Sequence, residues 1–213
     1  MKLDPGAYDF LSNFSTVGAI VLGSVMATMG ALAATQIEWR VERRRREQHA
    51  AVFFGEVLAT LLAILRIARR VKGIGDPYGP VTMRMLRQAL QEIGIYDRNR
   101  ENLYAIQNPA LRARIHTSVL RISSPLNGVF DTSEEVRAGQ ARLRTPGLQK
   151  EERDEIESRI QQLTEMREGA FEFMERTALE IEALVKDLEP VAGHSFVDIA
   201  AAARACLARD TAT

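Results

Sequence analysis

The sequence predicts an all-α protein in which one N-terminal transmembrane helix continues into a cytoplasmic antiparallel helical bundle or coiled coil. Three observations support this prediction. Residues 10–37 carry no charged side chain, and an arginine cluster follows that run at once. The rest of the chain repeats apolar residues at helical spacing and is interrupted by glycine and proline. With 213 residues, the chain has room for one domain and a short appendage.

Residues 14–37 form the predicted transmembrane helix, and residues 1–13 form a short N-terminus outside the cytoplasm. About 20 apolar residues are enough to cross a hydrocarbon core. Small residues recur at every fourth position of this run, so they share one helix face on which a second helix can pack closely in lipid. This predicted packing face consists of Ser15, Ala19, Gly23, Ala27, Ala31 and Thr35. The alternative is an accidental register, since small residues are common in membrane helices.

The basic residues after the run predict its orientation, because positive charges beside a span stay in the cytoplasm. The predicted protein is therefore single-pass with its N-terminus outside, a layout that many small proteins of the bacterial inner membrane share by analogy of architecture. The residues assigned to orientation and to lipid headgroups are Trp39, Arg40, Arg43, Arg44, Arg45 and Arg46. A cleaved signal peptide is the rival interpretation, because Ala31-Leu32-Ala33 resembles a cleavage site. The arginines that would follow the cut argue against it.

Residues 38–213 form the predicted cytoplasmic helical domain. Residues 38–72 contain no proline, so the first helix is expected to continue through them. Ala50–Leu65 is mostly apolar but short for a span and contains Glu56, which favours a buried helix. A second span, giving a membrane hairpin, remains the alternative. Glycine and proline then predict a loop at 73–80 and a further helix at about 81–95.

Four further features divide the second half of the chain. Asn108 and Pro109 predict the N-cap and first residue of a helix to about residue 122, and Ser123-Ser124-Pro125 predicts a kink or restart. A capping box at Asp131–Glu134 predicts a short segment that ends at Pro146-Gly147.

A long helix is predicted at about 148–188, where apolar residues follow a 3,4 pattern with Arg167 and Thr177 as polar intrusions. Ser195 and Asp198 then predict a cap for a terminal helix at about 196–209.

The charge distribution suggests a partner for the long helix. Residues 38–75 hold nine basic and four acidic side chains, whereas residues 149–190 hold six and thirteen. Antiparallel packing would place these opposite charges side by side. One alternative is that the long helix packs as a coiled coil with another copy of the chain. The other is that the charged residues on these helices only keep them soluble.

Composition excludes several function classes. The 28 basic and 28 acidic residues balance, so a nucleic-acid partner is not expected. Three scattered histidines and one cysteine predict no metal site, and Cys206 alone cannot form an intramolecular disulfide. Without a nucleophile motif or a phosphate-binding glycine loop, we expect no cofactor and no catalysis. The one compact polar and aromatic patch, a possible partner or ligand surface, contains Tyr96, Arg98, Arg100 and Tyr104.

Together these features predict a non-catalytic, membrane-anchored interaction or scaffold protein that forms a homo-oligomer or recruits a protein partner. One alternative is a two-span hairpin, with 50–65 as the second span, acting as a transport or channel accessory. A second is a membrane-tethered ligand sensor, which predicts a polar pocket near residues 96–108. A third is an enzyme whose groups do not form a recognisable motif.

Overall fold

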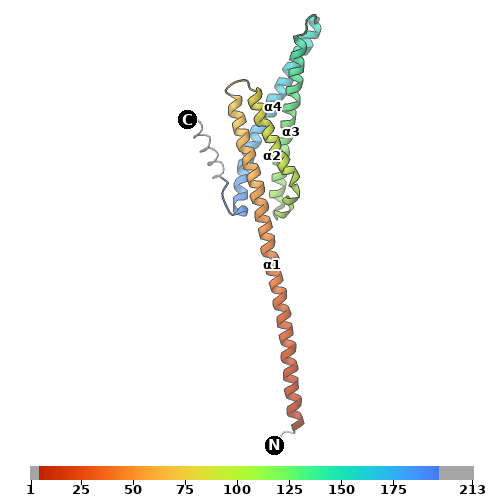
Figure 1. The fold of residues 1–213 in the computed structure, drawn as a ribbon, viewed down its shortest axis with the longest axis vertical. Helices are drawn as coiled ribbons and strands as arrows, with labels where there is room; N and C mark the ends of the chain where they lie inside the picture. Colours follow the sequence, from red (N-terminus) through yellow and green to blue (C-terminus); the bar gives the residue numbers. More distant parts are fainter. Residues whose placement is uncertain (1–4, 197–213) are drawn as a thin grey trace. The chain divides into compact units, whose positions relative to one another are not determined.

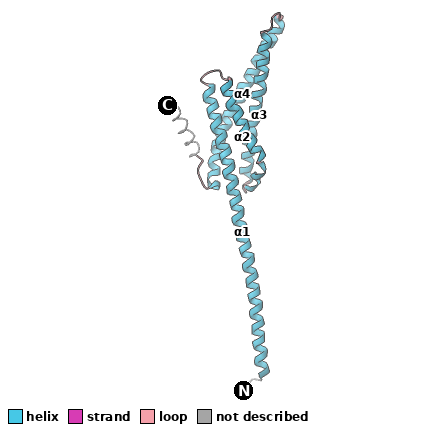
Figure 2. Cartoon of the chain, in the orientation of Figure 1, coloured by secondary structure: helices cyan, strands magenta, loops and turns pink. Residues whose placement is uncertain are grey.

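The computed structural model describes residues 5–196, and the side chains of residues 21–196. All regular elements within that range are helical, which confirms the all-α prediction (Figure 2). The four α-helices are α1 (Pro5–Lys72), α2 (Pro80–Arg98), α3 (Pro109–Leu143) and α4 (Lys150–Ala192), and a 3₁₀-helix, η1, spans Arg100–Ala105 (Figure 1). The chain divides into two compact units, Met1–Arg45 and Arg46–Thr213.

Helix α1 is long and apolar enough to cross a membrane by length and composition, and it is the one helix of the described residues with this property. A signal sequence or a buried core helix meets the same criterion. In the most apolar stretch of 18 residues of α1, 56% is buried within the protein. Because residues 21–46 are exposed throughout, that stretch lies further along the helix. Its apolar character is thus explained by a protein core.

The unit Arg46–Thr213 has one hydrophobic core, to which α1, α2, α3 and α4 all contribute. From α1 it receives most of Ala50–Leu65, the stretch that the alternative interpretation made a second span. Glu56 lies on the exposed side of that stretch, as expected for the polar face of a core helix. The largest fully buried side chains are Tyr96, Phe54, Phe196, Leu58, Leu61, Leu86, Ile106, Ile115, Ile122, Leu126, Met174 and Ile181.

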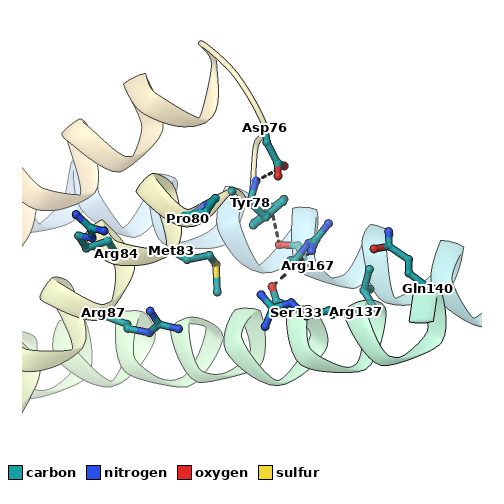
Figure 3. Close-up of a pocket in the computed structure, with 12 residues that line it drawn as sticks. Asp76, Tyr78, Pro80, Met83, Arg84, Arg87, Ser133, Arg137, Gln140 and Arg167 are labelled. Atoms are coloured by element: carbon teal, nitrogen blue, oxygen red, sulfur yellow. Dashed lines mark hydrogen bonds between the residues drawn. The ribbon is translucent and has the colours of Figure 1, made fainter. Parts of the chain in front are cut away.

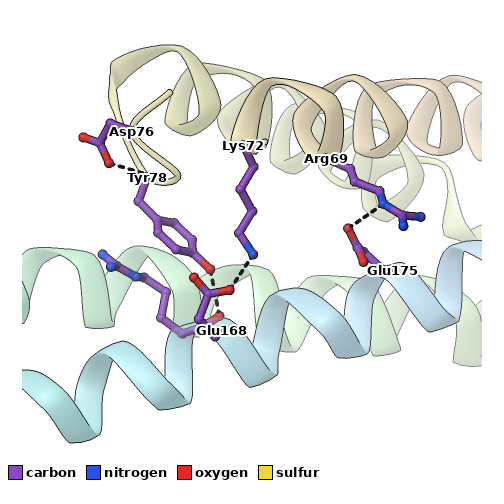
Figure 4. A network of polar contacts seen from close by, with 7 residues as sticks. Arg69, Lys72, Asp76, Tyr78, Glu168 and Glu175 are labelled. Carbon is purple, nitrogen blue, oxygen red and sulfur yellow. Dashed lines mark hydrogen bonds and ion pairs between the residues drawn. The ribbon is translucent and has the colours of Figure 1, made fainter. Parts of the chain in front are cut away.

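Ion pairs join the basic part of α1 to the acidic α4. Arg66 pairs with Glu182 at 2.6 Å, and Arg69 pairs with Glu175 at 3.3 Å. The third pair, Lys72 with Glu168 at 2.5 Å, continues the antiparallel order (Figure 4). These contacts agree with the charge distribution of the sequence. Because the two arginines are more than half exposed, each of their ion pairs contributes only about 0 to 1 kcal/mol to stability. We infer that the pairs select the register in which α1 packs against α4.

Helix α3 differs from the prediction, because one continuous helix replaces the two predicted segments. Pro125 lies inside it, and no cap forms at Asp131–Glu134. Thr132 Oγ1 donates instead to the carbonyl of Gly128 at 2.7 Å, as a hydroxyl does within a helix. The apolar stripe explains the difference, because Ile122, Leu126 and Val129 continue it across the proline and are fully buried. The proline costs one hydrogen bond, which this burial offsets.

The predicted ends of the other helices agree more closely. Asn108 caps α3, and its side-chain oxygen accepts from the backbone N–H groups of Ala110 and Leu111 at 3.0 and 3.3 Å. Helix α4 continues through Pro190 to Ala192 and is capped by Gly193, whose φ of 77° suits glycine. Ser195 Oγ donates to Glu189 at 2.8 Å. Asp198 and the predicted terminal helix at about 196–209 lie outside the described residues, except for Phe196.

Candidate functional site

The first candidate site is the outer part of α1, where every described side chain from residue 21 to residue 46 is exposed. Apolar groups are therefore left uncovered by the rest of the described chain on all sides of the helix. The large apolar side chains of this segment are between 45% and 67% exposed, and they are Val21, Leu22, Val25, Met26, Met29, Leu32, Ile37, Trp39 and Val41. Soluble monomers rarely leave so large a continuous apolar surface uncovered. The segment requires an apolar environment or a partner.

The predicted packing face on this segment is open along its described length. A Cβ atom added at Gly23 would meet nothing within 4 Å. Ala27, Ala31 and Thr35 are exposed, and the Thr35 hydroxyl donates to the carbonyl of Ala31 at 3.0 Å. The face is thus smooth, and this hydroxyl is satisfied within its own helix. Ser15 and Ala19 lie outside the residues whose side chains are described.

The basic cluster follows directly. Trp39 is 66% exposed, and the Arg43 guanidinium lies 5.8 Å from its ring centroid, which is within cation–π range. Arg40, Arg44, Arg45 and Arg46 are exposed as well. An amphipathic tryptophan next to exposed arginines is an arrangement suited to the headgroup level of a bilayer.

The patch predicted around Tyr96 is divided between interior and surface. Tyr96 is only 1% exposed, and its hydroxyl lies 2.9 Å from His116 Nδ1. Burial raises the pKa of Tyr96, so the phenol is neutral near pH 7. Tyr104 is 80% exposed, and Arg98 and Arg100 are exposed too. The structure therefore does not bring these four side chains together around one cavity.

A second candidate site, which we name the arginine pocket, lies where the loop before α2 meets α2, α3 and α4. It is a cavity of about 390 Å³ (Figure 3). Arg84 and Arg87 come from α2, Arg137 from α3 and Arg167 from α4. Its remaining lining residues are Asp76, Tyr78, Gly79, Pro80, Met83, Ser133, Val136 and Gln140. The lining thus contains four arginines and one carboxylate.

Tyr78 fixes one wall of the arginine pocket. The Arg167 guanidinium lies 3.7 Å from the centroid of its ring, and its hydroxyl donates to the backbone carbonyl of Arg167 at 3.3 Å. Asp76 accepts from the Tyr78 N–H at 3.1 Å, which shapes the loop (Figure 4). Burial, followed by the nearby Glu168 carboxylate, raises the pKa of Tyr78, so this hydroxyl remains protonated and able to donate. Tyr78 and Arg167 therefore hold each other in place.

Lys72 supports the same wall from α1. Its Nζ lies 4.2 Å from the ring centroid of Phe171 and 5.4 Å from that of Tyr78. The ion pair with Glu168 completes the network. Glu168 thus pairs with Lys72, and Arg167 forms no ion pair with the side chains described at 21–196.

The arginine pocket was not predicted from the sequence, although two signals point towards it. Arg84 and Arg87 are three residues apart on a predicted helix, so they share a face. Arg167 stands out as a polar residue in the apolar pattern of the long helix. The pocket forms because α2, α3 and α4 pack together in the folded chain. The apolar periodicity of the sequence predicts each helix but does not predict which helices pack against one another.

Among the side chains described at 21–196, no group of three or more histidine, cysteine, aspartate and glutamate residues is placed to hold a metal ion. Comparison of the chain with protein-family models, with curated proteins and with solved structures finds no match.

Proposed function

We propose that this chain is a single-pass, membrane-anchored and non-catalytic interaction protein. Residues 14–37 are its anchor, and residues 38–213 are a cytoplasmic antiparallel helical bundle that recruits a protein partner or assembles with further copies. The observation that carries the proposal is the exposure of the apolar side chains on every face of α1 between residues 21 and 37.

Lipid accounts for this exposure better than the other environments. A buried core helix would be covered by neighbouring helices, as Ala50–Leu65 is, and this segment is not. Within a helix all central backbone groups are hydrogen-bonded, so the segment can enter hydrocarbon at little polar cost. A signal sequence would be removed and would leave the arginine cluster at the new N-terminus, a poor start for a translocated chain.

One span is favoured over a hairpin. Ala50, Ala51, Phe54, Leu58 and Leu61 are buried against the protein's own core. Moving this stretch into lipid would strip α2, α3 and α4 of their shared partner. The arginine cluster then favours a cytoplasmic position for everything that follows the anchor.

Placing two arginines in the anchor is expected to release the protein from the membrane. In Val25→Arg/Met29→Arg, each charge near the middle of the span costs about 2.5 to 3.5 kcal/mol on insertion scales. The matched control is Leu120→Arg/Met166→Arg, because both residues are exposed on the other unit at 52% and 61%. After alkaline extraction, wild type and control should sediment with membranes, and the anchor variant should be soluble or degraded. Equal sedimentation of all three would contradict the anchor.

The same membranes test orientation. Maleimide that does not cross membranes is expected to label Ser12→Cys in intact cells and to reach the native Cys206 only after lysis. Labelling of Cys206 in intact cells would refute the cytoplasmic placement of the domain.

Crosslinking through the small-residue face tests assembly. In a Cys206→Ser background, Ala27→Cys is expected to form a disulfide-linked dimer on mild oxidation in membranes, because two such faces can approach closely. Met29→Cys is the control, since a residue two positions on points to the opposite side of the helix. If both variants crosslink equally, the contact is not specific to the face, and if neither does, the anchor does not assemble through it.

A further inference from the structure

The arginine pocket differs from the rest of the helical unit because its arginines are not paired with carboxylates of the described part of the chain. Six cationic side chains elsewhere between the helices meet a carboxylate, and these are Arg66, Arg69, Lys72, Arg114, Arg121 and Arg159. The four arginines of the pocket form no ion pair with any side chain described at 21–196. The lining is therefore net positive, with four arginines and the single carboxylate of Asp76.

Arg167 is the strongest single indication of a ligand. Its Nε is buried and has no hydrogen-bond partner in the described part of the chain. One terminal nitrogen lies 3.5 Å from the Ser133 hydroxyl, at the limit of a hydrogen bond. A buried donor without an acceptor is costly. Arg167 also lines the cavity, so an anion there would meet its guanidinium group. Stacking on Tyr78 already fixes the guanidinium, so binding would require little further ordering.

The start of α2 adds to the positive potential. Gly79 occupies the N-cap and offers no side-chain acceptor, so the first N–H groups of α2 lack a side-chain cap. Both Gly79 and Pro80 line the cavity. An uncapped helix N-terminus favours negative charge and strengthens the effect of the arginines, although it would not make a site alone.

We propose that the arginine pocket binds an anion that carries phosphate. Guanidinium groups match phosphate oxygens in paired hydrogen bonds, and four arginines contributed by three helices suit a multiply charged group better than a single carboxylate. The volume of about 390 Å³ accommodates a diphosphate or a small phosphorylated compound. A free compound and a lipid headgroup share this chemistry. The inference goes beyond the proposed interaction role and does not rest on the membrane anchor.

Calorimetric titration of the full chain with sodium pyrophosphate tests the proposal. The protein is held in phosphatidylcholine nanodiscs at constant ionic strength, so that non-specific screening stays fixed. Saturable binding is expected for wild type. Arg84→Gln/Arg137→Gln should weaken it by about tenfold or more, since each loses charged hydrogen bonds. Both arginines are exposed, so folding should survive the change.

Two further variants sharpen the result. Asp76→Asn removes the pocket's one carboxylate and keeps an oxygen that accepts from Tyr78, so it should strengthen binding. Arg153→Gln removes an exposed arginine from α4 outside the pocket and should leave the affinity unchanged. Absence of saturable binding in wild type would overturn the proposal. An equal loss in Arg153→Gln would overturn it as well, since the binding would then be general attraction.

A second experiment distinguishes the two sources of the phosphate, a lipid headgroup and a free compound. Co-flotation of the same nanodiscs with vesicles containing phosphatidylinositol bisphosphate should fall in Arg84→Gln/Arg137→Gln, relative to Arg153→Gln, if a headgroup enters the pocket. If only pyrophosphate binding falls, the ligand is a free compound.

Discussion

Phe54→Ala is expected to lower the free energy of unfolding by about 3 to 5 kcal/mol, as large-to-small changes of buried aromatic residues do. Phe54 is fully buried in the common core. Its ring lies 5.2 Å from that of Phe53 and 5.7 Å from that of Tyr96, both in edge-on geometry. Removing it deletes both contacts and leaves a cavity at the point where α1 meets α2. Urea unfolding of the full chain in mild detergent, followed by circular dichroism, measures the change.

Phe53→Ala is the matched control, because it removes the same side chain from the neighbouring position. Phe53 is only partly buried, so less apolar area and a smaller cavity are lost. We expect its effect to be about half that of Phe54→Ala or less. Equal losses for the two variants would mean that α1 does not present this face to the core.

Local signals in the sequence predicted much of the fold because the physics behind them is local. Asn108 before Pro109 determines a helix start by one side-chain cap and one fixed φ, and both act within a few residues. The glycine and proline cluster at 73–80 likewise ends α1 and supplies Pro80 as the first residue of α2. Such features need no partner elsewhere in the chain.

Where distant segments decided the outcome, local signals failed. The capping box at Asp131–Glu134 is a sound local motif, yet the burial of Val129 and Val136 on either side keeps this stretch in α3. Tyr96 similarly belongs to a polar stretch of sequence but packs inward against Phe54 and His116. The arginine pocket is the extreme case, since its residues come from a loop and three helices.

The position of the Phe196 ring depends on the absence of a side chain at Gly55. Gly55 is buried in α1, and a Cβ atom built on it would lie 2.1 Å from Phe196 Cζ. The ring, only 1% exposed, therefore occupies the space that any other residue at position 55 would fill. Helical propensity alone would favour alanine there by about 1 kcal/mol. Glycine fits this position, against that propensity, because it leaves room for the ring.

Gly55→Ala is accordingly expected to destabilise the protein by about 0.5 to 2 kcal/mol, since expelling a buried phenylalanine costs about 1.5 to 3 kcal/mol and the gain in propensity of about 1 kcal/mol offsets part of it. Gly169→Ala is the control within a helix. A Cβ there meets nothing within 4 Å, so this change should stabilise by about 0.5 to 1 kcal/mol. Urea unfolding in detergent again measures both.

A double-mutant cycle separates the steric effect from every other effect of the alanine. In a Phe196→Ala background the space beside Gly55 is empty, so Gly55→Ala should become stabilising, as Gly169→Ala is. This reversal of sign follows only if the ring and the Cβ compete for one volume. If Gly55→Ala destabilises equally with and without the Phe196 ring, the two residues are not coupled, and the cost lies in α1 itself.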